Sequence, residues 1–290
     1  MLATLVAMLA LAQESPRFPP HYAGRATTCP VGGETFDAPA LMHYSTFGAL
    51  PDGQPVGSIG FPILLAECPG NGLVIYDEFT PEQVTRLAPL VSSDTYKALR
   101  GAESSYYRAS WLADALGDRK QAAWLLLSAT WEAKNADQAG ERARRYNAAF
   151  AAAAMALPAD AKDFASIALR ARAANALREL GRFEEAEVLR TAIVLAPDAG
   201  GTEEKAAQNR EGWAGYLKKL AGPIARKDSV RLPIDMMPDR EVVFRCLGKE
   251  YAVRYKRPSP APLTVFEIEY CARPEFAADL VERRKQLAAQ

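Results

Sequence analysis

The four cysteines are the residues of this chain with the best-defined chemistry. Cys29, Cys68, Cys246 and Cys271 form an even set, which predicts disulfides in an oxidising compartment. Four cysteines allow three pairings. Chain order favours Cys29 with Cys68 and Cys246 with Cys271, because each pair then lies inside one predicted domain. The alternative is a set of buried free thiols that pack as small apolar groups.

The compartment depends on the segment from Met1 to Ala12. It is apolar apart from Thr4 and ends in Ala10-Leu11-Ala12, which is typical of a secretory signal peptide and its small-residue cleavage site. It is too short for a membrane helix, which needs about 20 residues. We therefore expect a periplasmic or secreted protein without integral membrane insertion. A misassigned start codon is the alternative, because no Lys or Arg precedes the apolar core.

The sequences after the first two cysteines resemble the knuckles of a zinc ribbon. They are Cys29-Pro30-Val31-Gly32-Gly33 and Cys68-Pro69-Gly70-Asn71-Gly72. A zinc ribbon needs a second cysteine in each knuckle, because four thiolates complete the tetrahedral site. Here Gly32 and Asn71 stand at those positions. We therefore predict no bound metal or cofactor, and a disulfide in place of the metal.

Two alternatives to this disulfide stay open. One is zinc held by Cys29, Cys68 and a histidine, for which the chain offers only His21 and His43. The other is a pair of free thiols. Zinc binding by reduced cysteines would make the protein a cytoplasmic scaffold.

Catalytic motifs are scarce. The chain has no H-E-x-x-H, no G-x-x-x-x-G-K-[ST] and no G-x-G-x-x-G sequence. The acidic residues Asp77 and Glu78 lie near a predicted domain boundary. An enzyme, possibly hydrolase-like, that uses Asp77, Glu78 or His43 in a cleft beside the helices is therefore the second hypothesis for function.

Composition excludes one class of partner. The chain carries 35 Lys and Arg against 35 Asp and Glu, so its formal net charge is zero. A strongly basic nucleic-acid-binding protein is excluded by this balance. We expect no nucleic-acid partner. Because 49% of the residues are hydrophobic, the chain can bury a substantial core.

Proline and glycine divide the rest of the chain into three parts. Residues 13–79 are rich in both and predict an irregular module with short strands. Residues 80–222 predict helices, beginning with the capping box Thr80-Pro81-Glu82-Gln83. Short connections between these helices predict an antiparallel array. Residues 223–290 predict a small α+β unit.

The prediction for the last part is specific. Alternating apolar residues predict a hairpin from Glu241–Cys246 and Glu250–Lys256 and a further strand over Leu263–Tyr270, followed by a helix from Pro274. The fold class is therefore α+β and mainly α.

The helical part contains an internal repeat. Four positions recur at a constant offset: Ser110, Leu116, Gly117 and Ala122 match Ala174, Leu180, Gly181 and Ala186. This pattern resembles the tetratricopeptide repeat, which has small residues where helices touch and a glycine at the turn. A single helix over Asp137–Leu157 lies between the copies, so the array is irregular.

This arrangement resembles the N-terminal part of a family of uncharacterised bacterial proteins that joins a ribbon-like segment to tetratricopeptide-like helices. Besides the knuckles, the matching segments are Phe36-Asp37-Ala38-Pro39 and Leu73-Val74-Ile75-Tyr76. The resemblance covers roughly residues 25 to 195. It implies this architecture and no particular activity.

Candidate partner-binding residues follow from aligning the two repeat copies. The alignment places Tyr107, Trp111 and Asp114 on the same helix face as Asn175 and Arg178. Tetratricopeptide-like arrays bind extended peptides along such a face. We therefore expect an exported, non-enzymatic protein that binds an unknown protein or peptide. The alternative is that Tyr107 and Trp111 are core residues.

Overall fold

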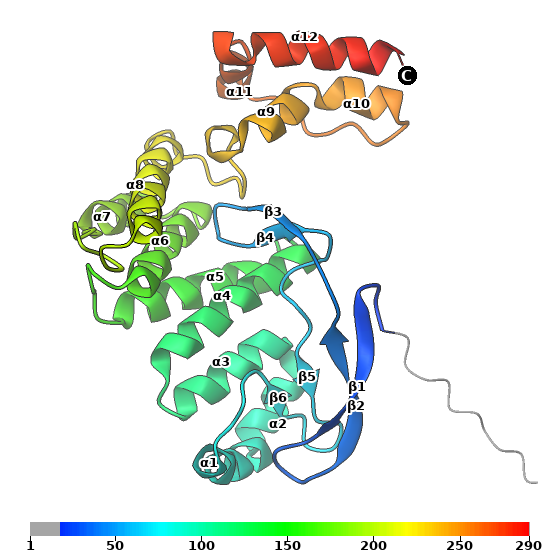
Figure 1. The fold of residues 1–290 in the computed structure, drawn as a ribbon, viewed down its shortest axis with the longest axis vertical. Helices are drawn as coiled ribbons and strands as arrows, with labels where there is room; N and C mark the ends of the chain where they lie inside the picture. The colour runs from blue at the N-terminus through cyan, green and yellow to red at the C-terminus, as the bar shows by residue number, and fades with distance from the viewer. Residues whose placement is uncertain (1–17, 290) are drawn as a thin grey trace, which may run out of the picture.

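The computed structural model of the protein describes residues 18–289 (Figure 1). The predicted signal peptide, Met1 to Ala12, lies outside these residues. The described chain is an α+β structure made mainly of helices, which confirms the predicted fold class. No helix among the described residues is both long enough and apolar enough to cross a membrane.

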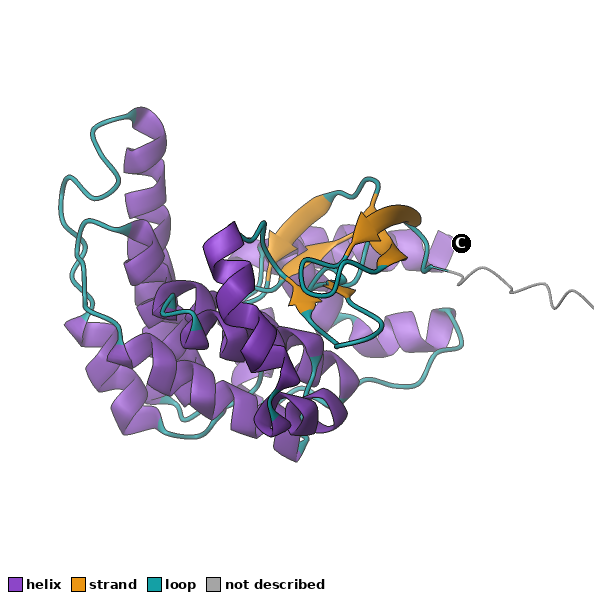
Figure 2. Cartoon of the chain, turned by 90° about the horizontal axis from the view of Figure 1, so that it is seen from below, coloured by secondary structure: helices purple, strands orange, loops and turns teal. Residues whose placement is uncertain are grey.

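The N-terminal module consists of three small antiparallel sheets, each of two strands. They pair β1 (Tyr22–Thr28) with β2 (Thr35–Leu41), β3 (Thr46–Ala49) with β4 (Pro55–Gly57), and β5 (Ala66–Glu67) with β6 (Val74–Ile75). Figure 2 shows these strands gathered together beside the helices. The frequent prolines and glycines keep the strands short, because they favour turns.

Eight helices follow along the chain. They are α1 (Pro81–Ser92), α2 (Asp94–Ala102), α3 (Ser105–Ala115), α4 (Arg119–Ala136), α5 (Glu141–Ala156), α6 (Phe164–Glu179), α7 (Phe183–Ala192) and α8 (Glu204–Ala225). The capping box at Thr80 is confirmed: its hydroxyl accepts the Gln83 N–H, and the Gln83 side chain accepts the Thr80 N–H. The repeat residues Ala174 and Ala186 are fully buried, and their small side chains let neighbouring helices approach closely.

The C-terminal part corrects the sequence prediction, because it contains helices where a hairpin and a strand were expected. It consists of the short 3-10 helix η1 (Ile234–Met236), α9 (Asp239–Cys246), α10 (Gly248–Arg254), α11 (Val265–Cys271) and α12 (Pro274–Ala289). Thr264 caps α11 in a capping box with Glu267. Phe266 and Tyr270 alternate in the sequence but are also one helical turn apart, where their rings lie 5.8 Å apart. A short apolar run does not distinguish a strand from a helix.

The two predicted disulfide pairings are confirmed. Cys29 bonds to Cys68 within the N-terminal module, with a Cα–Cα distance of 5.6 Å. Cys246 bonds to Cys271 with a Cα–Cα distance of 5.8 Å. The second bond joins the ends of two helices, α9 and α11, instead of two strands.

The turn between β3 and β4 attaches the N-terminal module to the helices. The Pro51 carbonyl accepts from the Tyr216 hydroxyl of α8 at 2.7 Å. The Asp52 carboxylate accepts from Lys134 of α4 at 3.0 Å. Next to Asp52, Gly53 has a φ of +83°, and a Cβ at this position would overlap the Arg172 guanidinium of α6. The turn thus contacts three helices, and glycine is required at its closest approach.

We predict that Gly53→Ala lowers the free energy of unfolding by about 1–3 kcal/mol, because it adds a clash at a left-handed backbone position. Urea unfolding of the oxidised protein measures this change. Gly48→Ala in β3 is the matched control, since a Cβ there meets nothing within 4 Å and its φ is not positive. Equal stability of the two variants would contradict the prediction.

Candidate functional site

The two cysteine knuckles have the same backbone geometry. In the first, the Cys29 carbonyl accepts from the Gly33 N–H at 3.1 Å, and in the second the Cys68 carbonyl accepts from the Gly72 N–H at 2.9 Å. Both glycines have a positive φ, of 72° and 73°, where glycine is favoured. The two knuckles therefore adopt the same turn, although neither contains a second cysteine.

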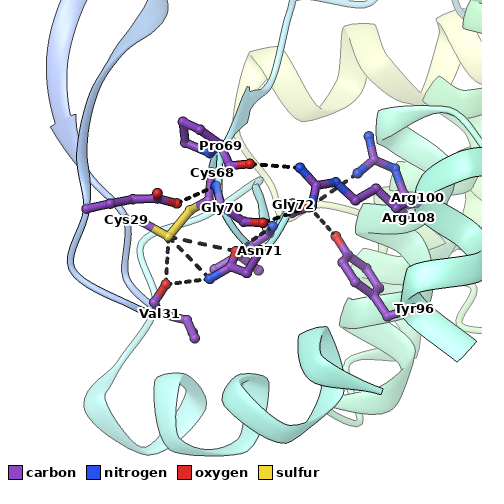
Figure 3. Close-up of a disulfide and its surroundings, with 12 residues drawn as sticks. Cys29, Val31, Cys68, Pro69, Gly70, Asn71, Gly72, Tyr96, Arg100 and Arg108 are labelled. Atoms are coloured by element: carbon purple, nitrogen blue, oxygen red, sulfur yellow. Dashed lines mark hydrogen bonds between the residues drawn. A yellow bond between two sulfur atoms is a disulfide. The ribbon is translucent and has the colours of Figure 1, made fainter. Parts of the chain in front are cut away.

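Asn71 occupies the space between the knuckles (Figure 3). Its Nδ2 donates to the Val31 carbonyl at 2.5 Å and lies 3.8 Å from Cys29 Sγ. Its Oδ1 accepts from the Leu73 N–H at 2.9 Å. A Cβ at Gly32 would lie 3.6 Å from the same Nδ2. The two positions that lack thiolates thus face each other, and one amide bridges the knuckles there.

The metal hypotheses find limited support in this geometry. One atom each from Cys29, Cys68 and Glu34 lie within 4.8 Å of one another, but the two sulfurs are bonded to each other and offer no thiolate. The histidines His21 and His43 contact each other, with ring centroids 5.3 Å apart. They lie at the opposite end of the β1–β2 hairpin, roughly 26 Å from the cysteines at about 3.3 Å per residue.

The second knuckle is held by side chains that sequence reasoning missed. Three residues of α2 and α3 donate to its backbone carbonyls: Tyr96, Arg100 and Arg108 (Figure 3). Tyr96 and Arg108 both donate to the Gly72 carbonyl, at 2.7 and 3.2 Å. Arg108 is only 5% exposed and pairs with Glu67 at 2.6 Å. No local sequence pattern indicates these contacts, because the partners are far apart in the chain.

The proposed residues for enzymatic chemistry are not brought together. His43 lies beyond the end of β2, next to the paired ends Tyr22 and Leu41. Asp77 and Glu78 follow β6, whose partner strand β5 adjoins Cys68. All three side chains are exposed and lie near opposite ends of the N-terminal module. They form no common cleft.

Asn175 and Arg178 are also separated from the predicted binding face, which corrects the alignment. Both are fully buried. Asn175 Oδ1 accepts from Arg178 at 2.9 Å, and Arg178 donates to the carbonyls of Asp228 and Val230 at 2.6 and 2.8 Å. They hold the segment after α8 against α6 and are not available to a partner. Burial lowers the pKa of Arg178 from its ordinary value.

The reason for this correction is the direction of the helices. Aligning the two repeat copies assumes that α3 and α6 run the same way. Short connections join α3 to α4, α4 to α5 and α5 to α6, so each helix runs antiparallel to the one before it. The single helix α5 between the copies therefore reverses the second copy relative to the first.

Tyr107, Trp111 and Asp114 do share a surface. They line a groove of about 410 Å³ between α3, α4 and α5. Its other lining residues are mostly apolar: Ser110, Arg119, Ala122, Leu126, Ala153, Ala156 and Leu157. The Tyr107 ring stacks on Tyr146 at 4.6 Å, so it belongs to the core and to the groove together. Trp111 likewise contacts Tyr96, with ring centroids 5.8 Å apart.

A buried ion network lies near the C-terminal end of α4, whose N-terminal half lines the groove. Lys134 of α4 pairs with Asp52 of the β3–β4 turn at 3.0 Å and with Glu179 of α6 at 2.7 Å. Arg231 pairs with the same Asp52 oxygen at 3.2 Å. Burial disfavours the charged form of Asp52, but Lys134 and Arg231 outweigh it and hold the pKa of this carboxyl below its ordinary value.

Comparison with known proteins finds no match to this chain. The chain matches no protein-family model, no curated protein and no solved structure. The resemblance to ribbon-containing bacterial proteins with tetratricopeptide-like helices therefore stays a prediction.

We predict that Asn71→Ala lowers the free energy of unfolding by about 1–3 kcal/mol, because the Val31 carbonyl and Leu73 N–H lose a partner in a part-buried site. Urea unfolding under non-reducing conditions measures the loss. Asn209→Ala in α8 is the control: Asn209 is exposed, so this variant is expected to stay within about 0.5 kcal/mol of the wild type. Equal losses in the two variants would show that the amide does not bridge the knuckles.

We predict a pH-dependent effect for Asp52→Asn. Because the folded-state pKa of Asp52 is lowered, its ionised form stabilises the fold above the unfolded pKa of about 3.9. The wild type should therefore be about 3 kcal/mol more stable than the variant at pH 7. This difference should shrink as the pH falls below about 4. Urea unfolding of both proteins between pH 7 and pH 3 measures it, and a difference that is independent of pH would contradict the prediction.

Proposed function

We propose that the protein is exported and binds an extended segment of another protein or a peptide, without catalysing a reaction. The observation that carries this proposal is the groove between α3, α4 and α5, with Tyr107 and Trp111 in its wall. Rigid aromatic side chains supply contact area at little cost in conformational entropy. Helical arrays of this kind bind extended peptides in grooves between their helices.

The chemistry of the groove defines the partner. Leu126, Leu157 and three alanines make its floor apolar, so it favours an aliphatic or aromatic side chain of the peptide. Asp114 and Arg119 are exposed at its edge and form no ion pair with any residue that the structure describes. They are therefore available to pair with charged groups of the peptide beside the apolar side chain.

Export is supported by two features. Both cysteine pairs are disulfide-bonded, which is compatible with a periplasmic or extracellular location. The sequence from Met1 to Ala12 has the pattern of a signal peptide.

We predict that Ala156→Trp weakens peptide binding, because the new ring fills the groove from an exposed position. Peptides are selected from a phage-displayed random heptapeptide library on the wild-type protein, and the affinities of synthetic copies are measured by fluorescence anisotropy. Binding should weaken at least about tenfold, which corresponds to about 1.4 kcal/mol. Asp114→Asn should weaken those peptides that carry a basic residue.

Ala278→Trp on α12 is the matched control, because Ala278 is also an exposed helical alanine and lies outside the groove. This variant should bind the selected peptides like the wild type. The proposal is wrong if the library yields no binding peptide, or if the selected peptides bind the Ala156→Trp variant with wild-type affinity.

A further inference from the structure

A second hollow, separate from the groove, lies where the β3–β4 turn meets the helices. It has a volume of about 430 Å³ and lies between this turn, α6, α8 and η1. Arg172 of α6 lines it together with Trp213, Tyr216 and Met236. The cavity therefore combines one guanidinium with apolar and aromatic walls, which is the composition of a small-ligand site.

Arg172 has no acidic partner. Its guanidinium carbon lies 5.1 Å from the Trp213 ring and 5.5 Å from the Trp124 ring. It forms no hydrogen bond or ion pair with any residue in the described part of the chain. Burial lowers the pKa of the Arg172 guanidinium from its ordinary value. A guanidinium has five N–H donors in a planar fork that fits a carboxylate. Those donors are left free beside an open cavity.

The surrounding charges do not neutralise this arginine. The basic side chains of the junction are Lys134, Arg172, Arg178, Arg226 and Arg231, and its carboxylates are Asp52, Glu179, Asp228 and Asp235. Asp52 is already paired with Lys134 and Arg231, and Glu179 with Lys134. Asp228 and Asp235 are both paired with Arg226. Five cations thus face four carboxylates, which leaves one positive charge in excess. Glu211 and Lys219 also line the cavity, but they are exposed and of opposite sign, so they leave the positive excess unchanged.

Two glycines keep the cavity open. Gly212 and Gly215 lie three residues apart on α8 and both line it, so they share one helix face. A Cβ at either position would meet nothing within 4 Å. Glycine inside a helix costs about 0.5–1 kcal/mol relative to alanine. No steric conflict among the described residues requires this cost, and the two glycines leave free space in the cavity that Trp213 and Tyr216 also line.

We propose that this cavity binds a carboxylate attached to an apolar group. The carboxylate accepts two N–H groups from Arg172, and the apolar group lies against Trp213, Tyr216 and Met236. A carboxylate supplies the negative charge that the junction lacks, and the aromatic walls suit an apolar substituent. A free N-acylated apolar amino acid and the C-terminus of a peptide share this chemistry.

The test uses N-acetyl-L-phenylalanine and its amide as probes, titrated into the oxidised full-length protein by calorimetry and tryptophan fluorescence. The acid should bind at least about tenfold more tightly than the amide, because charge-assisted bonds to Arg172 need the carboxylate. Arg172→Gln should lose this preference. Arg144→Gln on α5 is the control, since Arg144 is exposed and lies outside the cavity. An acetylated tripeptide ending in phenylalanine distinguishes the two ligand sources: tighter binding than the single residue indicates a peptide C-terminus, and weaker binding a free acid.

Gly215→Phe keeps the proposal testable if the Arg172 variant does not fold. This substitution fills the open space and leaves Arg172 in place, so it should remove binding of the acid while circular dichroism stays unchanged. The proposal is overturned if the acid and its amide bind equally, if the folded Gly215→Phe variant keeps the wild-type affinity, or if the wild type binds neither probe at millimolar concentration.

Discussion

The structure depends on one buried ion pair, between Lys134 of α4 and Asp52 of the β3–β4 turn. Their side chains are only 3% and 4% exposed. Burying two charges is costly unless each finds its partners. Glu179 and Arg231 supply those partners from α6 and from the segment after α8. One network thus connects the N-terminal module, two helices of the array and the start of the C-terminal part. If one of these elements is displaced, a buried charge on another element loses a partner.

This connection and the groove use different parts of the helical array. The β3–β4 turn contacts the C-terminal half of α4 together with α6 and α8. The Arg172 cavity lies beside this contact. The groove that contains Tyr107 and Trp111 is lined by α3, by the N-terminal half of α4 and by the end of α5. The ribbon-like knuckles support this arrangement because they fix the N-terminal module to α2 and α3. The Cys29–Cys68 disulfide and the Asn71 amide hold the two knuckles to each other.

The predictable features are those encoded locally. The cysteine pairs follow from chain order, and the start of α1 follows from a capping box within four residues of sequence. The C-terminal strands were predicted wrongly, because Phe266 and Tyr270 satisfy both a strand and a helix pattern. The predicted placement of Asn175 and Arg178 on the binding face was wrong for a different reason: the single helix α5 reverses the direction of the second repeat. Contacts such as Arg108 with Gly72, or Lys134 with Asp52, join distant segments and leave no local pattern to detect.

The most direct test of this account is a double-mutant cycle between Asp52 and Lys134, measured by urea unfolding at pH 7 with Asp52→Asn, Lys134→Met and the double variant. A coupling energy of at least about 2 kcal/mol is predicted, because each single substitution leaves the other group buried with one of its two charge partners removed. The exposed pair Asp94–Lys97 serves as the control cycle and should couple by less than about 0.5 kcal/mol. Coupling as small in the Asp52–Lys134 cycle as in the control would contradict the account, since the N-terminal module would then be held to the helices by other contacts.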